Sequence, residues 1–190
     1  APTLGDLTDK AGAVFSDNAT TIVSLDVLPA LELQDQPGYD LLGIRVVGSA
    51  TVTLSELVET LGNSDWLATG REYLHESDGL CPFCQQVAPA TLAADLAAMF
   101  DDHYAAQLAE IEAFSTHFEE WHDRVAAVAD APSISASEFL DKAAFQAARR
   151  NLDAVINVNE RLLGQKNTTP SDVVEFESVD SALKAVNDVI

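Results

Sequence analysis

Cysteines, basic residues and long apolar runs are all scarce in this chain of 190 residues. Two cysteines cannot form the disulfide scaffold of a small secreted protein, and we therefore expect a reducing, cytoplasmic compartment. No apolar run approaches the roughly 20 residues that cross a bilayer, and no signal peptide is visible. We accordingly expect neither membrane insertion nor secretion.

The charge balance is strongly acidic. Ten Lys and Arg residues oppose 31 Asp and Glu residues, which gives a net charge of −21. Binding of nucleic acid or anionic lipid relies on clustered basic side chains, so this balance opposes both. The acidity indicates either a well-solvated surface, typical of salt-adapted proteins, or an acidic patch that docks a basic partner.

Motifs for nucleotide binding and for common types of catalysis are also missing from the sequence. It contains no G-x-x-x-x-G-K-[ST] phosphate loop, no G-x-G-x-x-G, no H-E-x-x-H, no G-x-S-x-G and no EF-hand loop. We therefore expect that this chain binds no nucleotide and contains no catalytic residue.

The spacing of apolar residues predicts a mainly α-helical chain in two parts. Residues 1–62 should form a smaller cap, irregular or α+β, with a helix at 4–16. Extended segments with turns, and room for one small hairpin, should follow over 21–47. A capping box at 53–56 should open another short helix. Residues 63–190 should form a helical domain, whose first helix is capped by Asn63 or Ser64.

A long apolar seam between residues 89 and 130 is the strongest helical signal. Two series of residues repeat every seven positions, as in a helix that packs along another helix. The first series is Ala97, Tyr104, Ile111, Phe118 and Val125, and the second is Phe100, Gln107, Phe114, Trp121 and Val128. A second helix, capped by Ser135 or Ser137 and ending near residue 165, should return antiparallel and complete a long coiled-coil hairpin. A connector at 167–176 and a final helix from about residue 178 should follow.

The two cysteines, Cys81 and Cys84, form a Cys-Pro-Phe-Cys turn that supports three interpretations. In the first, both thiolates bind zinc. The two missing ligands then come from the same turn of a second protomer, because His75 lies on a helix that ends before the turn. In the second, Cys81 is the nucleophile of a thiol–disulfide oxidoreductase, although no thioredoxin-like strand precedes it. In the third, two thiols stabilise the turn without a metal.

Several motifs follow one another in a distinctive order. They are Leu61-Gly62-Asn63-Ser64-Asp65-Trp66-Leu67 with Gly70, then Cys81-Pro82-Phe83-Cys84-Gln85-Gln86, then Phe100-Asp101-Asp102-His103-Tyr104 at the start of the coiled coil. This order, over roughly residues 54–176, resembles the internal region of AAA-type P-loop ATPases related to the bacterial anticodon nucleases PrrC and RloC. The resemblance implies a helical insertion in an ABC-like ATPase head. It also places Cys81 and Cys84 like the zinc hooks that join coiled-coil ATPases in pairs.

These features predict a non-catalytic element of a larger ABC-like AAA ATPase. It would transmit the nucleotide state or dimerise through the knuckle or the coiled coil. Its partners would be the remainder of its own polypeptide and a second protomer, and shared zinc would be the cofactor. A chain that starts at Ala1 and stops within a helical pattern at Ile190 is expected to be a fragment. The alternative functions are a small thiol–disulfide oxidoreductase and an acidic scaffold without metal.

Overall fold

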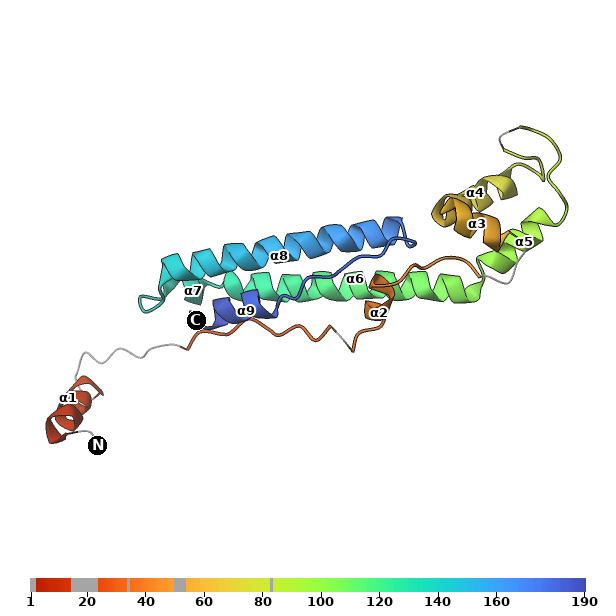
Figure 1. Ribbon diagram of the computed structural model, residues 1–190. Helices are drawn as coiled ribbons and strands as arrows, with labels where there is room; N and C mark the ends of the chain where they lie inside the picture. The colour runs from red at the N-terminus through yellow and green to blue at the C-terminus, as the bar shows by residue number, and fades with distance from the viewer. Residues whose placement is uncertain (1–2, 15–23, 34, 50–53, 83) are drawn as a thin grey trace.

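The computed structural model describes residues 3–14, 24–33, 35–49, 54–82 and 84–190 (Figure 1). Its helices are α1 (Leu4–Val14), α2 (Tyr39–Leu42), α3 (Ser55–Leu61), α4 (Ser64–Glu76), α5 (Leu92–Met99), α6 (Asp102–Ala129), α7 (Pro132–Ala136), α8 (Lys142–Thr168) and α9 (Asp180–Asn187). The prediction of a mainly helical chain is confirmed. Within the described ranges the β-structure is limited to one isolated bridge, between Leu80 and Val87.

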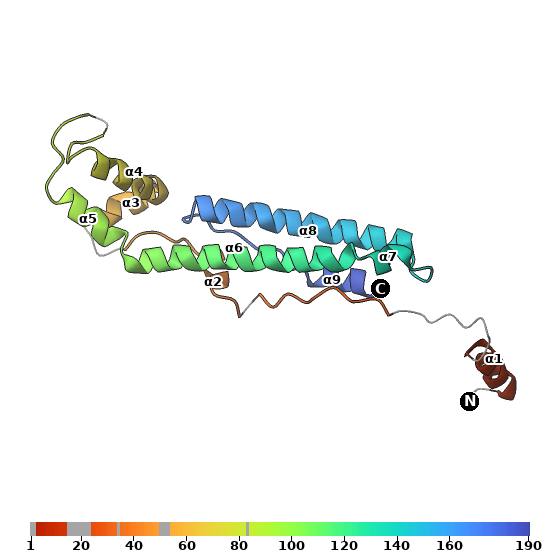
Figure 2. The ribbon, with the colours of Figure 1, turned by 180° about the vertical axis from the view of Figure 1, so that it is seen from behind.

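The two longest helices, α6 and α8, lie side by side and run in opposite directions (Figures 1 and 2). Near the end of α6, Asp130 forms an ion pair with Arg149, which lies in the first part of α8. Further along, His122 contacts Glu160 at 2.8 Å. In the middle of α6, the Ser115 hydroxyl accepts a hydrogen bond from the Asn167 amide, near the end of α8, at 2.8 Å. These three contacts set the register of the pair.

Aspartate side chains begin both long helices. The Asp101 carboxylate accepts hydrogen bonds from the N–H groups of His103 and Tyr104, each at 3.0 Å. Asp141 caps α8 in the same way. Such caps satisfy N–H groups that have no partner inside the helix.

Two predicted helix boundaries are therefore wrong. A single helix over 89–130 does not form, because Asp101 starts a new helix and Phe100, with φ −103° and ψ 64°, lies between α5 and α6. Ser135 and Ser137 do not cap the second long helix either. They belong to the short α7 and the turn after it, and α8 begins only after Asp141.

The predicted seam on α6 forms the centre of the main core. Trp121 and Phe118 are fully buried and Phe114 nearly so. The same cluster includes Leu152, Ile156 and Leu163 of α8, Val179, Leu183 and Val186 around α9, and Leu28 and Leu31 of the extended segment 24–33. Three segments of the same chain thus cover the seam, where the sequence predicted one returning helix.

Side-chain hydrogen bonds attach the extended segment 24–33 to this core. The Trp121 indole N–H donates to the Pro29 carbonyl oxygen at 2.9 Å. The Asn187 side chain accepts from the Leu28 N–H at 2.8 Å and donates to the Leu28 carbonyl oxygen at 3.1 Å. The prediction of extended segments with turns therefore holds over 24–33. The described part of 21–47 contains no paired hairpin, and residues 21–23 lie outside it.

A second core joins α3, α4 and α5 to the start of α6. Its buried members are Val46, Val58, Leu96, Met99, Phe100, Tyr104 and Ile111. Residues on both sides of the predicted boundary at 62/63 thus share one core. Gly62 ends α3 as expected, with a φ of 62° and its N–H bonded to the Val58 carbonyl oxygen. Asn63 precedes α4 but its side chain makes no capping bond, and Thr53 lies outside the described residues.

The helix predicted at 4–16 is confirmed over Leu4–Val14, while Phe15 lies outside the described residues. Its Leu4 and Leu7 are 81% and 50% exposed. Within the ranges that the structure covers, no helix combines the length and the apolar character needed to cross a bilayer.

Candidate functional site

The two cysteines lie in a short hairpin loop between α4 and α5. The Cys81 N–H donates to the Gln86 carbonyl oxygen at 2.8 Å, and the Gln85 N–H donates to the Cys81 carbonyl oxygen at 2.9 Å. Gln85 has a φ of 59°, which turns the chain sharply after the second cysteine. Cys84 is exposed and Cys81 is half-buried. The loop therefore presents two thiol residues close together in sequence at a tight turn.

The described residues supply only half of a tetrahedral zinc site. Among them, no group of three or more His, Cys, Asp or Glu side chains is placed to hold a metal ion. His75 lies on α4 and lines a groove between α4 and α5. A pair of thiolates fits the donor preference of zinc, but a closed structural site needs four ligands. Any further ligands would lie outside the described residues.

A buried lysine, Lys166, forms the centre of a second notable site. Its side chain is 0% exposed, and its ammonium donates to the carbonyl oxygens of Ile44 at 2.6 Å, Pro170 at 2.8 Å and Asp172 at 2.6 Å. A lysine has three donors, so all of them are used. Burial lowers the pKa of Lys166 below its ordinary value, while the charges of Asp172 and Asp65 act in the opposite direction.

Around Lys166, the segment 42–46 lies against the connector 170–174. The Val46 N–H donates to the Pro170 carbonyl oxygen and the Val174 N–H donates to the Leu42 carbonyl oxygen, both at 3.0 Å. We call this region, with the end of α8, the joint.

Asp65 connects the joint to α4. Its carboxylate accepts from the Ser171 hydroxyl at 2.5 Å and from the Ser171 N–H at 3.3 Å. The joint thus binds the end of α8 to the helices that precede the cysteine loop.

Sequence reasoning missed the joint. One signal was present, because the buried positions of α8 repeat at steps of three and four residues and Lys166 continues that series. The series is Leu152, Ile156, Asn159, Leu163 and Lys166. A charged residue on a helix's buried stripe indicates either a paired charge or an end of the stripe. Only the structure shows which carbonyl oxygens accept hydrogen bonds from the Lys166 ammonium group.

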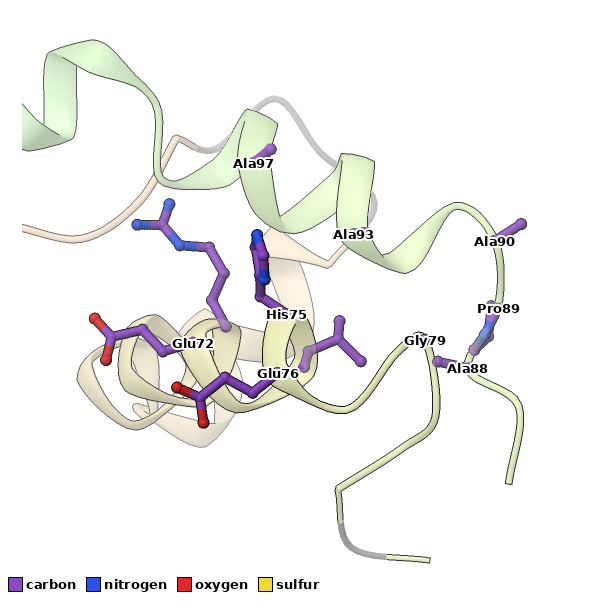
Figure 3. Close-up of a pocket in the computed structure, with 11 residues that line it drawn as sticks. Glu72, His75, Glu76, Gly79, Ala88, Pro89, Ala90, Ala93 and Ala97 are labelled. Atoms are coloured by element: carbon purple, nitrogen blue, oxygen red, sulfur yellow. The ribbon is translucent and has the colours of Figure 1, made fainter. Parts of the chain in front are cut away.

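The groove between α4 and α5, beside the cysteine loop, has a volume of about 880 Å³ (Figure 3). Ala93 and Ala97 of α5 form one side. Arg71, Leu74 and His75 of α4 line the other side together with Glu72 and Glu76. His75 points towards α5, whereas the carboxylates of Glu72 and Glu76 project away from it (Figure 3). Ala97 was predicted to lie in the seam of a long coiled coil. It lies in this groove because the helix ends at Phe100, before α6 begins.

The whole chain, residues 1–190, matches an AAA domain family. The protein therefore belongs to that family. No curated protein and no solved structure matches it.

Proposed function

We propose that this chain is a non-catalytic insertion of a larger ABC-like AAA ATPase, of the type related to PrrC and RloC. Its membership of the AAA domain family supports an ATPase context. The sequence itself contains no phosphate-binding loop. In this proposal, the nucleotide is bound elsewhere in the same polypeptide, and this chain responds to it.

The pairing of α6 with α8 supports a mechanical role. With 28 residues, α6 is about 42 Å long at a rise of roughly 1.5 Å per residue. Its apolar face is buried along most of its length, so it can move as a stiff unit with α8. We propose that the long helical hairpin carries a displacement from one end of the molecule to the other.

We further propose that Cys81 and Cys84 pair two protomers through a shared zinc ion. The single observation that carries this proposal is the exposed turn that offers two thiols and no third ligand among the described residues. Zinc would supply a fixed tetrahedral crosslink between two such turns. Dimerisation through the α6 seam is less suited to the geometry, because Phe118 and Trp121 are already buried within one chain.

Metal content and oligomeric state test this proposal together. The chain purified under reducing conditions should contain one zinc ion per two protomers. It should have the mass of a dimer in size-exclusion chromatography coupled to light scattering. Chelator, Cys81→Ser or Cys84→Ser should each give a zinc-free monomer. Gln86→Ala should keep both zinc and dimer, because Gln86 contributes to the turn through its backbone carbonyl.

A wild-type chain that contains no zinc would refute the proposal that zinc joins two protomers. If the zinc-free chain were a monomer and reduced a small disulfide through Cys81, the oxidoreductase alternative would replace the zinc proposal. If the chain showed neither zinc nor thiol reactivity, the acidic scaffold would be favoured.

A further inference from the structure

The hydroxyl group of Ser64 is buried without a hydrogen-bond partner beside a small cavity. Ser64 is 1% exposed and is the first residue of α4, and no described residue bonds to its Oγ atom. Burial of a polar group without a partner is costly, and native proteins rarely tolerate it. Ser64 also lines a cavity of about 230 Å³, bounded by α3, the start of α4 and the extended segment before α3. A ligand in this cavity would supply the missing partner.

The first N–H groups of α4 also lack acceptors. Asparagine is among the best capping residues, yet the side chain of Asn63, which precedes this helix of 13 residues, makes no capping bond. Among the described residues, no acceptor binds the N–H groups of Ser64 and Asp65. Such N–H groups carry a partial positive charge and point out of the helix end. The start of α4 therefore offers several donors beside the Ser64 hydroxyl.

Arg45 brings a full positive charge to the same cavity. Its side chain lines the cavity, is exposed, and forms no ion pair with the described residues. Val46 and Gly48 are buried while Arg45 and Val47 are exposed, which is the alternation of an extended chain. A guanidinium group has five donors in a planar fork that matches the oxygens of carboxylate and phosphate.

We propose that this cavity binds a free oxyanion of the size of phosphate. Three kinds of donor surround it: the Ser64 hydroxyl, the N–H groups that begin α4, and the Arg45 guanidinium. Oxyanions bind to such donors, and helix N-termini commonly provide them. The volume of about 230 Å³ is below the usual range for ligand pockets, about 300–1,000 Å³. The cavity thus suits a single small anion better than a nucleotide.

Two carboxylates near the cavity oppose an anion. Glu59 lines the cavity, is exposed, and forms no ion pair with the described residues. Asp65 lies in the first turn of α4, but its carboxylate accepts hydrogen bonds from Ser171. A net charge of −21 repels anions from the chain as a whole. Saturable phosphate binding would therefore require a specific site, and removal of the Glu59 charge should tighten it.

Titration of the isotope-labelled full chain with inorganic phosphate, at constant ionic strength and followed by amide NMR, measures both affinity and location. We expect saturable shifts that centre on the N–H groups of Ser64 and Asp65. Arg45→Gln should weaken binding by about fivefold or more. The control Arg124→Gln removes the same charge from the exposed surface of α6 and should change the affinity by less than about twofold.

Two further variants give effects of opposite sign. Ser64→Ala should weaken phosphate binding by about threefold or more, while the unfolding temperature without phosphate stays equal or rises, because an unpaired buried hydroxyl is removed. A purely structural Ser64 would give the reverse: lower stability and unchanged affinity. Glu59→Gln should tighten binding by about twofold or more, whereas Glu56→Gln, on the exposed surface of α3, should have a smaller effect.

Three results would overturn the proposal. The first is an absence of saturable shifts at the start of α4. The second is equal weakening by Arg45→Gln and Arg124→Gln, which would show an effect of net charge alone. The third is tighter binding of AMP than of phosphate, which would identify a nucleotide site rather than a site for a free oxyanion. Neither zinc nor the two cysteines enter this inference, so its outcome is independent of the zinc test.

Discussion

The ammonium group of Lys166 donates to the carbonyl oxygen of Ile44 at 2.6 Å, across 122 positions of sequence. The same group also binds two carbonyl oxygens of the connector after α8. One side chain therefore fastens the end of α8, the segment 42–46 and the connector to one another. No apolar residue could do this, because the three carbonyl groups would lose their donors.

Lys166→Met should lower the free energy of unfolding by about 2–4 kcal/mol, since it leaves buried carbonyl groups without a donor. Removal of a buried charge offsets part of this loss. Urea denaturation followed by tryptophan fluorescence measures the change. The control is Lys184→Met, which removes an exposed ion pair with Asp188 and should cost less than about 1 kcal/mol. Equal effects of the two variants would show that the Lys166 hydrogen bonds are not structurally important.

Ser171→Ala should loosen α4 without affecting α8, because it removes the hydroxyl that donates to Asp65. Amide hydrogen exchange read by mass spectrometry should show faster exchange in α4 and unchanged protection in the middle of α8. Ser133→Ala, on the exposed surface of α7, is the matched control and should alter neither. Unchanged exchange in α4 would mean that the joint does not hold that helix.

Asp101→Ala should destabilise the protein by about 1 kcal/mol, because it removes the cap of α6. Asp101→Asn keeps an acceptor oxygen and should remain within about 0.5 kcal/mol of the wild type. Thermal unfolding measured by circular dichroism compares the two. If alanine and asparagine were equivalent, the break between α5 and α6 would have another cause.

Asp130→Asn should reduce stability at neutral pH but not in acid. The hydrogen bond from Arg149 lowers the pKa of Asp130 below its ordinary value of 3.8. A carboxylate with a lowered folded-state pKa stabilises the fold above its ordinary pKa, and this contribution is lost as the pH falls through the folded-state value.

We therefore expect a difference of less than about 1 kcal/mol between wild type and Asp130→Asn at pH 7, since the carboxylate is mostly exposed. The difference should shrink as the pH drops below 3.8. Urea denaturation at pH 7 and pH 3 measures it, with Asp123→Asn as the control. A difference that grew in acid would contradict the assigned ion pair.

The sequence predicted the buried face of α6 correctly because large apolar residues repeat at the heptad period. Ile111, Phe114, Phe118 and Trp121 are all buried. The sequence did not predict the end of α5. Phe100 and Asp101 are compatible with a continuous heptad pattern, and they are equally compatible with the end of one helix and the start of the next. Capping by Asp101 decides between the two, and its effect depends on local N–H groups that a periodic pattern does not reveal.

The sequence could not reveal what covers the seam or what surrounds Lys166. The segment 24–33 has no helical period, so its packing against Trp121 depends on a long-range hydrogen bond to Pro29. Lysine is almost never fully buried, so a solvated Lys166 is the ordinary expectation. The structure does place Cys81 in a turn, as predicted, whereas zinc binding by Cys81 and Cys84 stays a prediction.

In the proposed lever, the break at Phe100 and Asp101 would act as an elbow. A continuous helix from residue 89 would transmit a displacement along its own axis. Two helices that meet at an angle, such as α5 and α6, would instead convert the displacement into a rotation. The moment arm is then α6 alone, about 42 Å, measured from the Asp101 cap. In that lever, a small tilt of α5 would therefore be magnified at the far end of α6, beside α7.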